Sequence, residues 1–143
     1  MKVSTRGRYA LRLMIELASH QPDDYVTLKE IALRQEISQK YLEQIISPLT
    51  RAGLVRAGRG SHGGYRLTRR PEEYTAGDVL RAVEGSLAPI SCLEEEPNTC
   101  PRAAQCRSLP FWQGLEQVIN NYVDSVTLED LRQQNLQEPD YII

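Results

Sequence analysis

Residues 27–68 read TLKEIALRQEISQKYLEQIISPLTRAGLVRAGRGSHGGYRLT, and this stretch decides the fold. Thr27 and Glu30 predict a capping box, in which each side chain accepts a hydrogen bond from a free backbone N–H at the start of a short helix. Ser38 predicts the N-cap of a second helix. The apolar residues of that helix recur at the i, i+3, i+4 and i+7 spacing of one buried face: Leu42, Ile45, Ile46 and Leu49. Two helices joined by a tight turn are therefore expected.

A glycine-rich hairpin is predicted directly after these helices. Pro48 removes one backbone hydrogen bond inside the second helix, so we expect a kink there rather than an end, and Gly53 predicts the C-terminal cap. Residues 54–57 and 65–68 favour two short strands. Four of the seven residues in 58–64 are glycines, which make a flexible tip that can approach a ligand closely. The whole stretch predicts a winged helix-turn-helix.

Amphipathic helices are predicted on both sides of this stretch. Ser4 would cap a first helix, whose buried face is formed by Ala10, Leu13, Met14, Leu17 and Ala18. Thr75 begins another capped helix, and Gly85 ends it. The expected fold class is therefore mainly α with a small β-hairpin.

The C-terminal half contains a long loop and a long helix. From Ser86 to Pro110 there are four prolines, a run of three glutamates and all three cysteines, a composition typical of a loop. The helix that follows carries an apolar stripe wider than a small domain needs: Phe111, Trp112, Leu115, Val118, Ile119, Tyr122, Val123 and Val126. We expect a partner subunit to cover it, and Thr127 to cap a final short helix.

Four segments are expected from these patterns. Residues 1–85 form a winged helix-turn-helix DNA-binding domain, and residues 86–107 a cysteine-containing sensor loop. Residues 108–135 form the dimerisation helix and a short capping helix, and residues 136–143 a polar tail.

Charge is distributed unevenly along the chain. Residues 1–70 hold 13 Lys and Arg against 6 Asp and Glu, and residues 71–143 hold 4 against 13, so the two parts carry +7 and −9. The basic part suits a phosphate backbone, whereas the acidic part would be repelled by it and must face another partner.

Several functional classes are disfavoured. No apolar run approaches the roughly 20 residues that span a bilayer, and the first residues lack the apolar core of a secretion signal, which predicts a cytoplasmic protein without a membrane partner. Only His20 and His62 are present, and no nucleophile and base are paired in the sequence, so an enzyme is not expected. The glycine-rich tip also lacks the lysine of a phosphate-binding loop.

Candidate DNA contacts follow from the winged helix-turn-helix. The second helix would enter the major groove, with its first residues at base edges or phosphates: Ser38, Gln39, Lys40, Tyr41, Glu43 and Gln44. Glu43 would read a cytosine. Arg59 and Gly60 at the wing suit a narrow minor groove. Phosphate contacts are expected from seven other arginines of the basic part: Arg6 and Arg51, with Arg8, Arg56, Arg66, Arg69 and Arg70.

Three stretches resemble a known family. They are residues 1–10, MKVSTRGRYA, residues 41–44, YLEQ, and residues 59–65, RGSHGGY, and they resemble the winged-helix transcription regulators that include IscR, NsrR and CymR. The resemblance covers nearly the whole chain. It implies a homodimer in which the long C-terminal helix crosses to the other subunit, and a partly palindromic operator in double-stranded DNA, with half-sites about one helical turn apart. It implies a regulator, which we expect to be a repressor.

Cys92, Cys100 and Cys106 stand in one loop at the spacing C-x7-C-x5-C, and converging thiolates are the usual ligands of iron-sulfur clusters. IscR-like and NsrR-like proteins carry three cysteines in this loop, whereas CymR-like proteins, which this chain resembles in its helices, generally lack them. Leu109 stands where IscR has a ligating histidine, and Arg8 where NsrR has an aspartate. The resemblance therefore supplies no fourth ligand, and it does not distinguish 2Fe-2S from 4Fe-4S.

Three alternatives stay open for the cysteines. A zinc ion could bind the three thiolates and one other ligand. The thiols could act in redox sensing or be inert, while a disulfide is disfavoured by their odd number. Without a cluster, the chain would act as a CymR-like regulator of cysteine and sulfur metabolism together with a protein corepressor.

Overall fold

The computed structural model describes residues 2–60 and 63–134, so the predicted tail, 136–143, lies outside the described residues. The helices are α1 (Thr5–Ala18), α2 (Leu28–Gln35), α3 (Gln39–Arg51), α4 (Ala76–Glu84), α5 (Leu109–Ser125) and α6 (Leu128–Gln133). The hairpin strands are β1 (Val55–Gly58) and β2 (Gly64–Leu67), and three short 3-10 turns span Pro71–Glu73, Ser91–Leu93 and Ala103–Gln105. The element order confirms the predicted mainly α fold with one hairpin.

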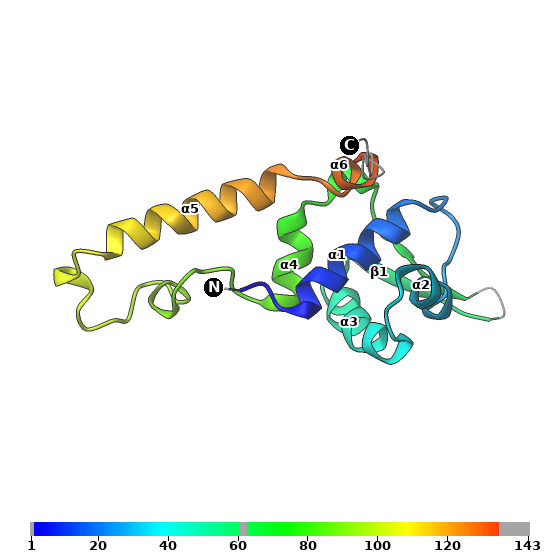
Figure 1. The fold of residues 1–143 in the computed structure, drawn as a ribbon, viewed down its shortest axis with the longest axis horizontal. Coiled ribbons are helices and arrows are strands. Elements are labelled where there is room, and N and C mark those ends of the chain that lie inside the picture. Colours follow the sequence, from blue (N-terminus) through cyan, green and yellow to red (C-terminus); the bar gives the residue numbers. More distant parts are fainter. Residues whose placement is uncertain (1, 61–62, 135–143) are drawn as a thin grey trace, which may run out of the picture.

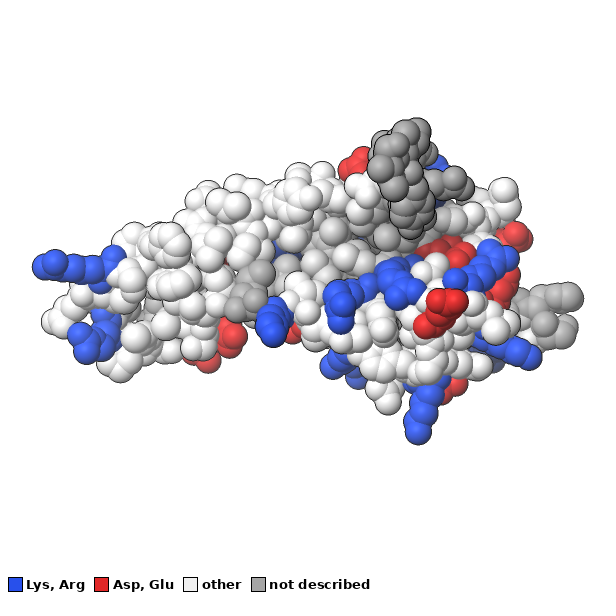
Figure 2. Space-filling model, in the orientation of Figure 1, with Lys and Arg blue, Asp and Glu red and all other residues white. Residues whose placement is uncertain are grey.

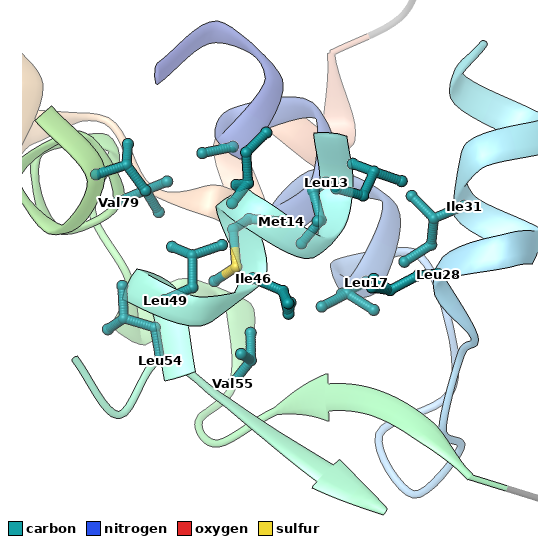
Figure 3. Close-up of a cluster of buried hydrophobic side chains, with 14 of the residues drawn as sticks. Leu13, Met14, Leu17, Leu28, Ile31, Ile46, Leu49, Leu54, Val55 and Val79 are labelled. Atoms are coloured by element: carbon teal, nitrogen blue, oxygen red, sulfur yellow. The ribbon is translucent and has the colours of Figure 1, made fainter. Parts of the chain in front are cut away.

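The elements up to α4, together with α6, form a globular part, and α5 projects from it as a long arm with the cysteine loop beside it (Figure 1). The core of the globular part is built from α1, α2, α3, β1 and α4, and Figure 3 shows its side chains meeting between those elements. Leu13, Ile31 and Leu49 are fully buried. Each such side chain contributes about 1.5–3 kcal/mol, so the predicted apolar faces account for the packing.

The two helices of the helix-turn-helix begin at the predicted caps. The Thr27 hydroxyl accepts from the backbone N–H of Glu30, and the Ser38 hydroxyl accepts from that of Tyr41. The predicted return bond from Glu30 is wrong, because its carboxylate pairs with Arg34 at 2.9 Å instead. An i,i+4 cation on the same helix face competes for that carboxylate.

Helix α3 runs through Pro48 without ending, as predicted, and the predicted kink stays a prediction. It ends in a Schellman motif, in which Leu54 N–H donates to Leu49 C=O and Gly53 N–H donates to Thr50 C=O, both at 3.0 Å. Gly53 has a φ of +74°, which explains the glycine at this position.

The hairpin pairs β1 and β2 antiparallel, with Val55 opposite Leu67 and Gly58 opposite Gly64, one residue away from the predicted strand bounds. A third segment joins its edge, because Val26 and Tyr65 exchange two backbone hydrogen bonds of 2.9 and 2.8 Å. The wing is thereby attached to the segment that leads into α2.

The start of α1 differs from the prediction. The Ser4 side chain accepts no hydrogen bond from the helix; its hydroxyl instead donates to the Glu84 carboxylate. The same Glu84 oxygen accepts from the backbone N–H of Ser4 and of Gly7, both at 3.0 Å. A negative charge at a helix N-terminus is favourable, so the end of α4 caps α1 across 77 to 80 residues of sequence.

Replacing Glu84 by Ala is expected to lower the free energy of unfolding by about 1–2 kcal/mol, the size of an N-cap loss. The measurement is urea unfolding at fixed protein concentration. Glu84→Gln keeps an acceptor oxygen and should recover part of the loss, while Glu72→Ala, at an exposed acid outside this contact, should change little. Equal midpoints for wild type and Glu84→Ala would contradict this role.

No helix in residues 2–60 and 63–134 is long and apolar enough to cross a membrane. The cytoplasmic location stays a prediction.

Candidate functional site

The predicted recognition helix presents a polar face. Ser38, Gln39, Lys40, Glu43 and Gln44 are all exposed, while the opposite face of α3 is buried in the core. One face of the helix is therefore packed on the core and the other is exposed to solvent, which is the arrangement needed for entry into a DNA groove.

Tyr41 is the exception among the predicted α3 contacts. It is half-buried, and its ring meets that of Tyr9 edge-to-face, with centroids 5.5 Å apart. Its packing fixes the start of α3 against α1, and only part of its surface is free for a ligand.

The other predicted DNA residues lie on the surface of the globular part. Arg59 and Gly60 are exposed at the described end of the wing, and Gly60 has a φ of +91°. Arg6 and Arg51 are exposed at the start of α1 and at the end of α3. In Figure 2 most of the visible Lys and Arg lie over the globular part, where Asp and Glu lie among them, and two further basic groups lie at the far end beside the arm. The length of the arm itself is largely uncharged in that view. DNA contact by these residues stays a prediction.

The predicted apolar stripe of α5 divides into two faces. Phe111, Leu115, Val118 and Tyr122 are exposed, by 65, 36, 63 and 69%. Their spacing of four, three and four residues places them along one seam. The other predicted members are half-buried on the neighbouring face: Trp112, Ile119, Val123 and Val126. Only the first group is free to meet a partner.

An ion pair joins the arm to the globular part. Arg81 of α4 donates to both carboxylate oxygens of Asp124 in α5, at 2.7 and 3.0 Å, and to Asn120 at 2.9 Å. A side chain at Gly77 would collide with Asp124 and Arg81, so this glycine allows the two helices to approach. The pair therefore connects the arm to α4 at a point where the two helices lie close together.

This ion pair predicts a pH dependence of stability. The Arg81 hydrogen bonds hold the pKa of the Asp124 carboxyl below its ordinary value of 3.8, although partial burial opposes them. Because the folded-state pKa is lowered, the stabilisation is present above the unfolded-state value and is lost as pH falls through the folded one. Chemical unfolding of wild type and Asp124→Asn should differ by a constant amount above about pH 5 and converge on acidification below about pH 4. A difference that does not vary with pH would contradict this assignment.

The three cysteines line one cavity. Cys92, Cys100 and Cys106 surround a space of about 160 Å³ at the start of α5, where Leu109 and Trp112 form part of its wall. All three thiols are free and half-buried. Within residues 2–60 and 63–134, however, no three His, Cys, Asp or Glu side chains lie close enough together to hold a metal ion. The thiols share a cavity but do not converge at one point.

Two polar side chains also face this cavity. The Ser108 hydroxyl lies 3.3 Å from the Cys106 sulfur, and this hydrogen bond holds the pKa of the Cys106 thiol below its ordinary value. The Asn98 side-chain oxygen accepts from the backbone N–H of Cys100 at 2.8 Å. Its Nδ2 group is buried and has no hydrogen-bond partner among the described residues. A buried, unsatisfied donor costs about 1–3 kcal/mol, so an acceptor is expected there.

Sequence reasoning missed the residues that connect the parts. The Arg81–Asp124 pair joins positions 43 residues apart, and no local pattern reveals it. Asn98 and Ser108 could have been noticed as donors beside cysteines, but their direction depends on the fold of the loop.

The exposed face of α3, the glycine-tipped wing and the projecting arm define the class: a winged-helix DNA-binding protein. Residues 3–134 match the model of the Rrf2 family, described as an iron-dependent transcriptional regulator. The chain belongs to this family, and it is a transcription regulator rather than an enzyme.

Its relatives include both CymR and IscR regulators, the two types that its sequence resembles. It is 42% identical over 131 residues to the HTH-type transcriptional regulator CymR of Bacillus subtilis, covering 92% of this chain and 89% of that protein. The CymR structure, described as that of the global cysteine regulator of B. subtilis, matches with a TM-score of 0.75 at 43% identity, covering 92% of this chain and 96% of that one.

IscR of Aliivibrio salmonicida is 38% identical over 135 residues, covering 94% of this chain and 79% of that protein. The structure of T. potens IscR matches with a TM-score of 0.73 at 38% identity, covering 92% of this chain and 85% of that one. The predicted resemblance to CymR and IscR is confirmed.

Proposed function

We propose that this chain is a homodimeric regulator whose affinity for operator DNA is controlled by an iron-sulfur cluster on Cys92, Cys100 and Cys106. The observation that supports it most is the single cavity lined by three thiols and by the unpartnered Asn98 N–H group. The iron-dependent description of the family and the likeness to IscR agree with it. We expect the regulator to act as a repressor.

DNA would be read by α3 and the wing. The exposed Gln39, Glu43 and Gln44 offer amide and carboxylate groups to base edges in the major groove, while Ser38 and Lys40 suit phosphates. Arg59 at the wing would enter the minor groove. Each base contact contributes about 1–3 kcal/mol of discrimination, so a few such contacts define an operator.

The α5 seam of Phe111, Leu115, Val118 and Tyr122 would form the dimer interface. These side chains lie on an arm that projects from the globular part (Figure 1) and whose visible surface carries little charge (Figure 2). Burying such a seam against a second copy removes large apolar groups from water. Two recognition helices are then held at a fixed separation, as a two-fold symmetric operator requires.

The cysteine loop is chemically suited to a cluster. Three thiolates are the normal donors, and hydrogen-bond donors beside the sulfurs stabilise a cluster's negative charge; the Ser108 hydroxyl contacts the Cys106 sulfur, and Asn98 lines the same cavity. When bound, the cluster supplies reversible electron transfer or loss of iron as the signal. Because the thiols do not converge in this structure, we expect loading to draw residues 92–106 inward.

A series of contacts connects this cavity to the expected DNA-binding surface. The first turn of α5, with Leu109 and Trp112, forms part of the cavity wall, so closure of the loop acts on the arm. The Arg81–Asp124 pair transmits a change in the arm to α4, which packs against α1 and α3. The separation of the two recognition helices is the quantity expected to change.

The DNA-binding assignment is tested by selecting bound duplexes from a random-sequence pool, followed by fluorescence anisotropy with the selected duplex. Gln44→Ala and Arg59→Ala should each weaken binding by roughly tenfold or more, and Arg59→Ala should also reduce the salt dependence. Arg132→Ala, in α6, is the matched control and should bind normally. Failure to enrich any sequence, or equal loss in the control, would contradict the assignment.

Asn98 gives a specific prediction for a loaded cluster. Replacing it by Leu removes the buried, unpartnered amide donor of a residue that lines the cavity. The reduction midpoint should therefore become more negative, on the order of tens of millivolts for a hydrogen bond of ~1 kcal/mol. The measurement is a redox titration of the visible absorption. Thr99→Ala, in the same loop, is the control. An unchanged midpoint in Asn98→Leu at full iron content would remove Asn98 from this role.

A second candidate is a cluster-free regulator of cysteine and sulfur metabolism that acts with a protein corepressor. The 42% identity to CymR and the separated thiols favour it. A zinc site or a thiol redox sensor on the same scaffold would use the same three cysteines. Iron and sulfide analysis separates these candidates from the cluster.

A further inference from the structure

A second cavity lies in the globular part, far along the chain from the cysteines. Its volume is about 480 Å³, within the range of small-molecule sites. The C-terminal end of α1 and the following loop form one wall, and the hairpin and the segment after it form the other. Leu17, Pro22 and Leu67 give it apolar surface. Four arginines line it: Arg56, Arg66, Arg69 and Arg70.

Two of these arginines are placed against each other. Arg56 and Arg66 are register partners in the antiparallel hairpin, so their side chains emerge side by side on the same face. Like charges directly opposite each other destabilise a hairpin. An anion bound to Arg56 beside this pair would offset that repulsion.

Two of the guanidinium groups are held in place by aromatic rings. The guanidinium carbon of Arg66 lies 4.8 Å from the centroid of the Tyr25 ring, and that of Arg69 lies 5.3 Å from the centroid of the Tyr74 ring. Tyr74 is fully buried, and its hydroxyl donates to Leu54 C=O at 2.6 Å while it accepts from the Thr68 N–H at 2.9 Å. A cation ordered before binding loses less entropy when its ligand arrives.

The protein's own carboxylates leave part of this charge unpaired. Arg70 is paired with Glu72 and Glu73, and Arg66 reaches only the fully exposed Asp23, at 3.9 Å. Within residues 2–60 and 63–134, Arg56 and Arg69 form no ion pair. The cavity therefore combines apolar surface with a net positive charge, because its four arginines exceed the three acids that line it, Asp23, Asp24 and Glu73.

We propose that this cavity binds a small organic anion, a carboxylate or phosphate ester, whose charge is held by Arg56 and Arg69 and whose apolar part packs on Pro22 and Leu67. A DNA phosphate offers the same charge but no apolar group, and the apolar walls favour the small molecule. Since the cavity joins the wing strands to the loop after α1, an occupant would hold the wing against the helical core. Occupation of this cavity would therefore change the affinity for DNA independently of the cysteines.

The test uses calorimetry and thermal unfolding of the full chain with phenyl phosphate, inorganic phosphate and glycerol as probes. Phenyl phosphate should bind once per chain and raise the melting temperature, inorganic phosphate should bind more weakly, and glycerol should have no effect. Arg56→Gln and Arg69→Gln should each weaken phenyl phosphate binding by about tenfold, the size of one charge-assisted hydrogen bond. Arg107→Gln makes the same charge change outside the cavity and should bind as wild type does.

Three results would overturn the proposal. They are an absence of heat and of melting shift with both anions, an equal loss in Arg107→Gln, and unchanged binding in both cavity variants. If Arg56→Gln and Arg69→Gln weaken DNA binding while the wild type binds neither anion, the arginines serve the DNA backbone instead. The measurements need no cluster and no operator, so their failure is distinct from failure of the proposed regulatory function.

Discussion

Replacing Cys100 by Ala is expected to abolish the visible absorption and the bound iron and sulfide of the anaerobically purified protein. The loss should be complete rather than partial, because the two remaining thiolates and weaker oxygen donors do not hold a cluster once one thiolate ligand is missing. The globular part should be unaffected, since Cys100 lies outside its core. Far-ultraviolet circular dichroism should therefore superimpose on that of the wild type.

Thr99→Ala is the matched control for this experiment, because it changes the neighbouring exposed residue of the same loop. It should keep its colour and its iron. A brown, iron-loaded Cys100→Ala protein would contradict the cluster assignment. A colourless wild type that cannot be reconstituted would contradict it too, and zinc analysis would then separate a zinc site from the corepressor alternative.

Replacing Val118 by Glu is expected to dissociate the dimer and to weaken operator binding by at least about 100-fold, because two half-sites are no longer bound together. Val118 is 63% exposed in the middle of the α5 seam. A carboxylate at this position would stay hydrated in the single chain, but in the dimer it would be buried without a partner. Sedimentation should report the mass of one chain, 16.2 kDa, at micromolar concentration.

Gln113→Glu provides the control for the seam. It adds the same charge to the same helix at an exposed position outside the seam, so the dimer and its DNA affinity should survive. A Val118→Glu protein that still sediments as a dimer would show that another surface holds the subunits together.

Structural features that depend on residues close together in the sequence could be predicted, whereas those that depend on distant residues could not. Caps at Thr27, Ser38, Thr75 and Thr127 depend on residues three positions away, and all four side chains accept the expected backbone hydrogen bond. The buried faces of α1, α3 and α4 follow from helical periodicity in the same way. Local chemistry was sufficient for the fold class.

Long-range contacts could not be predicted in this way. Ser4 has the residue type of a cap, but Glu84 of a distant helix takes that role. The predicted α5 stripe contained both its exposed and its packed residues, because periodicity alone does not say which apolar face meets the same chain. The pairing of Arg56 with Arg66 depends on hairpin register, which residue types leave open by one position.

In the proposed function, the state of the cysteine loop controls the affinity for DNA. The most direct measurement is fluorescence anisotropy with one selected operator duplex, recorded anaerobically for the cluster-loaded protein and for the same preparation after the iron is removed by chelation. We expect the two affinities to differ by about tenfold or more, the size of a typical coupling between two sites. Cys100→Ala should show no such difference. Equal affinities in the two states of the wild type would contradict it.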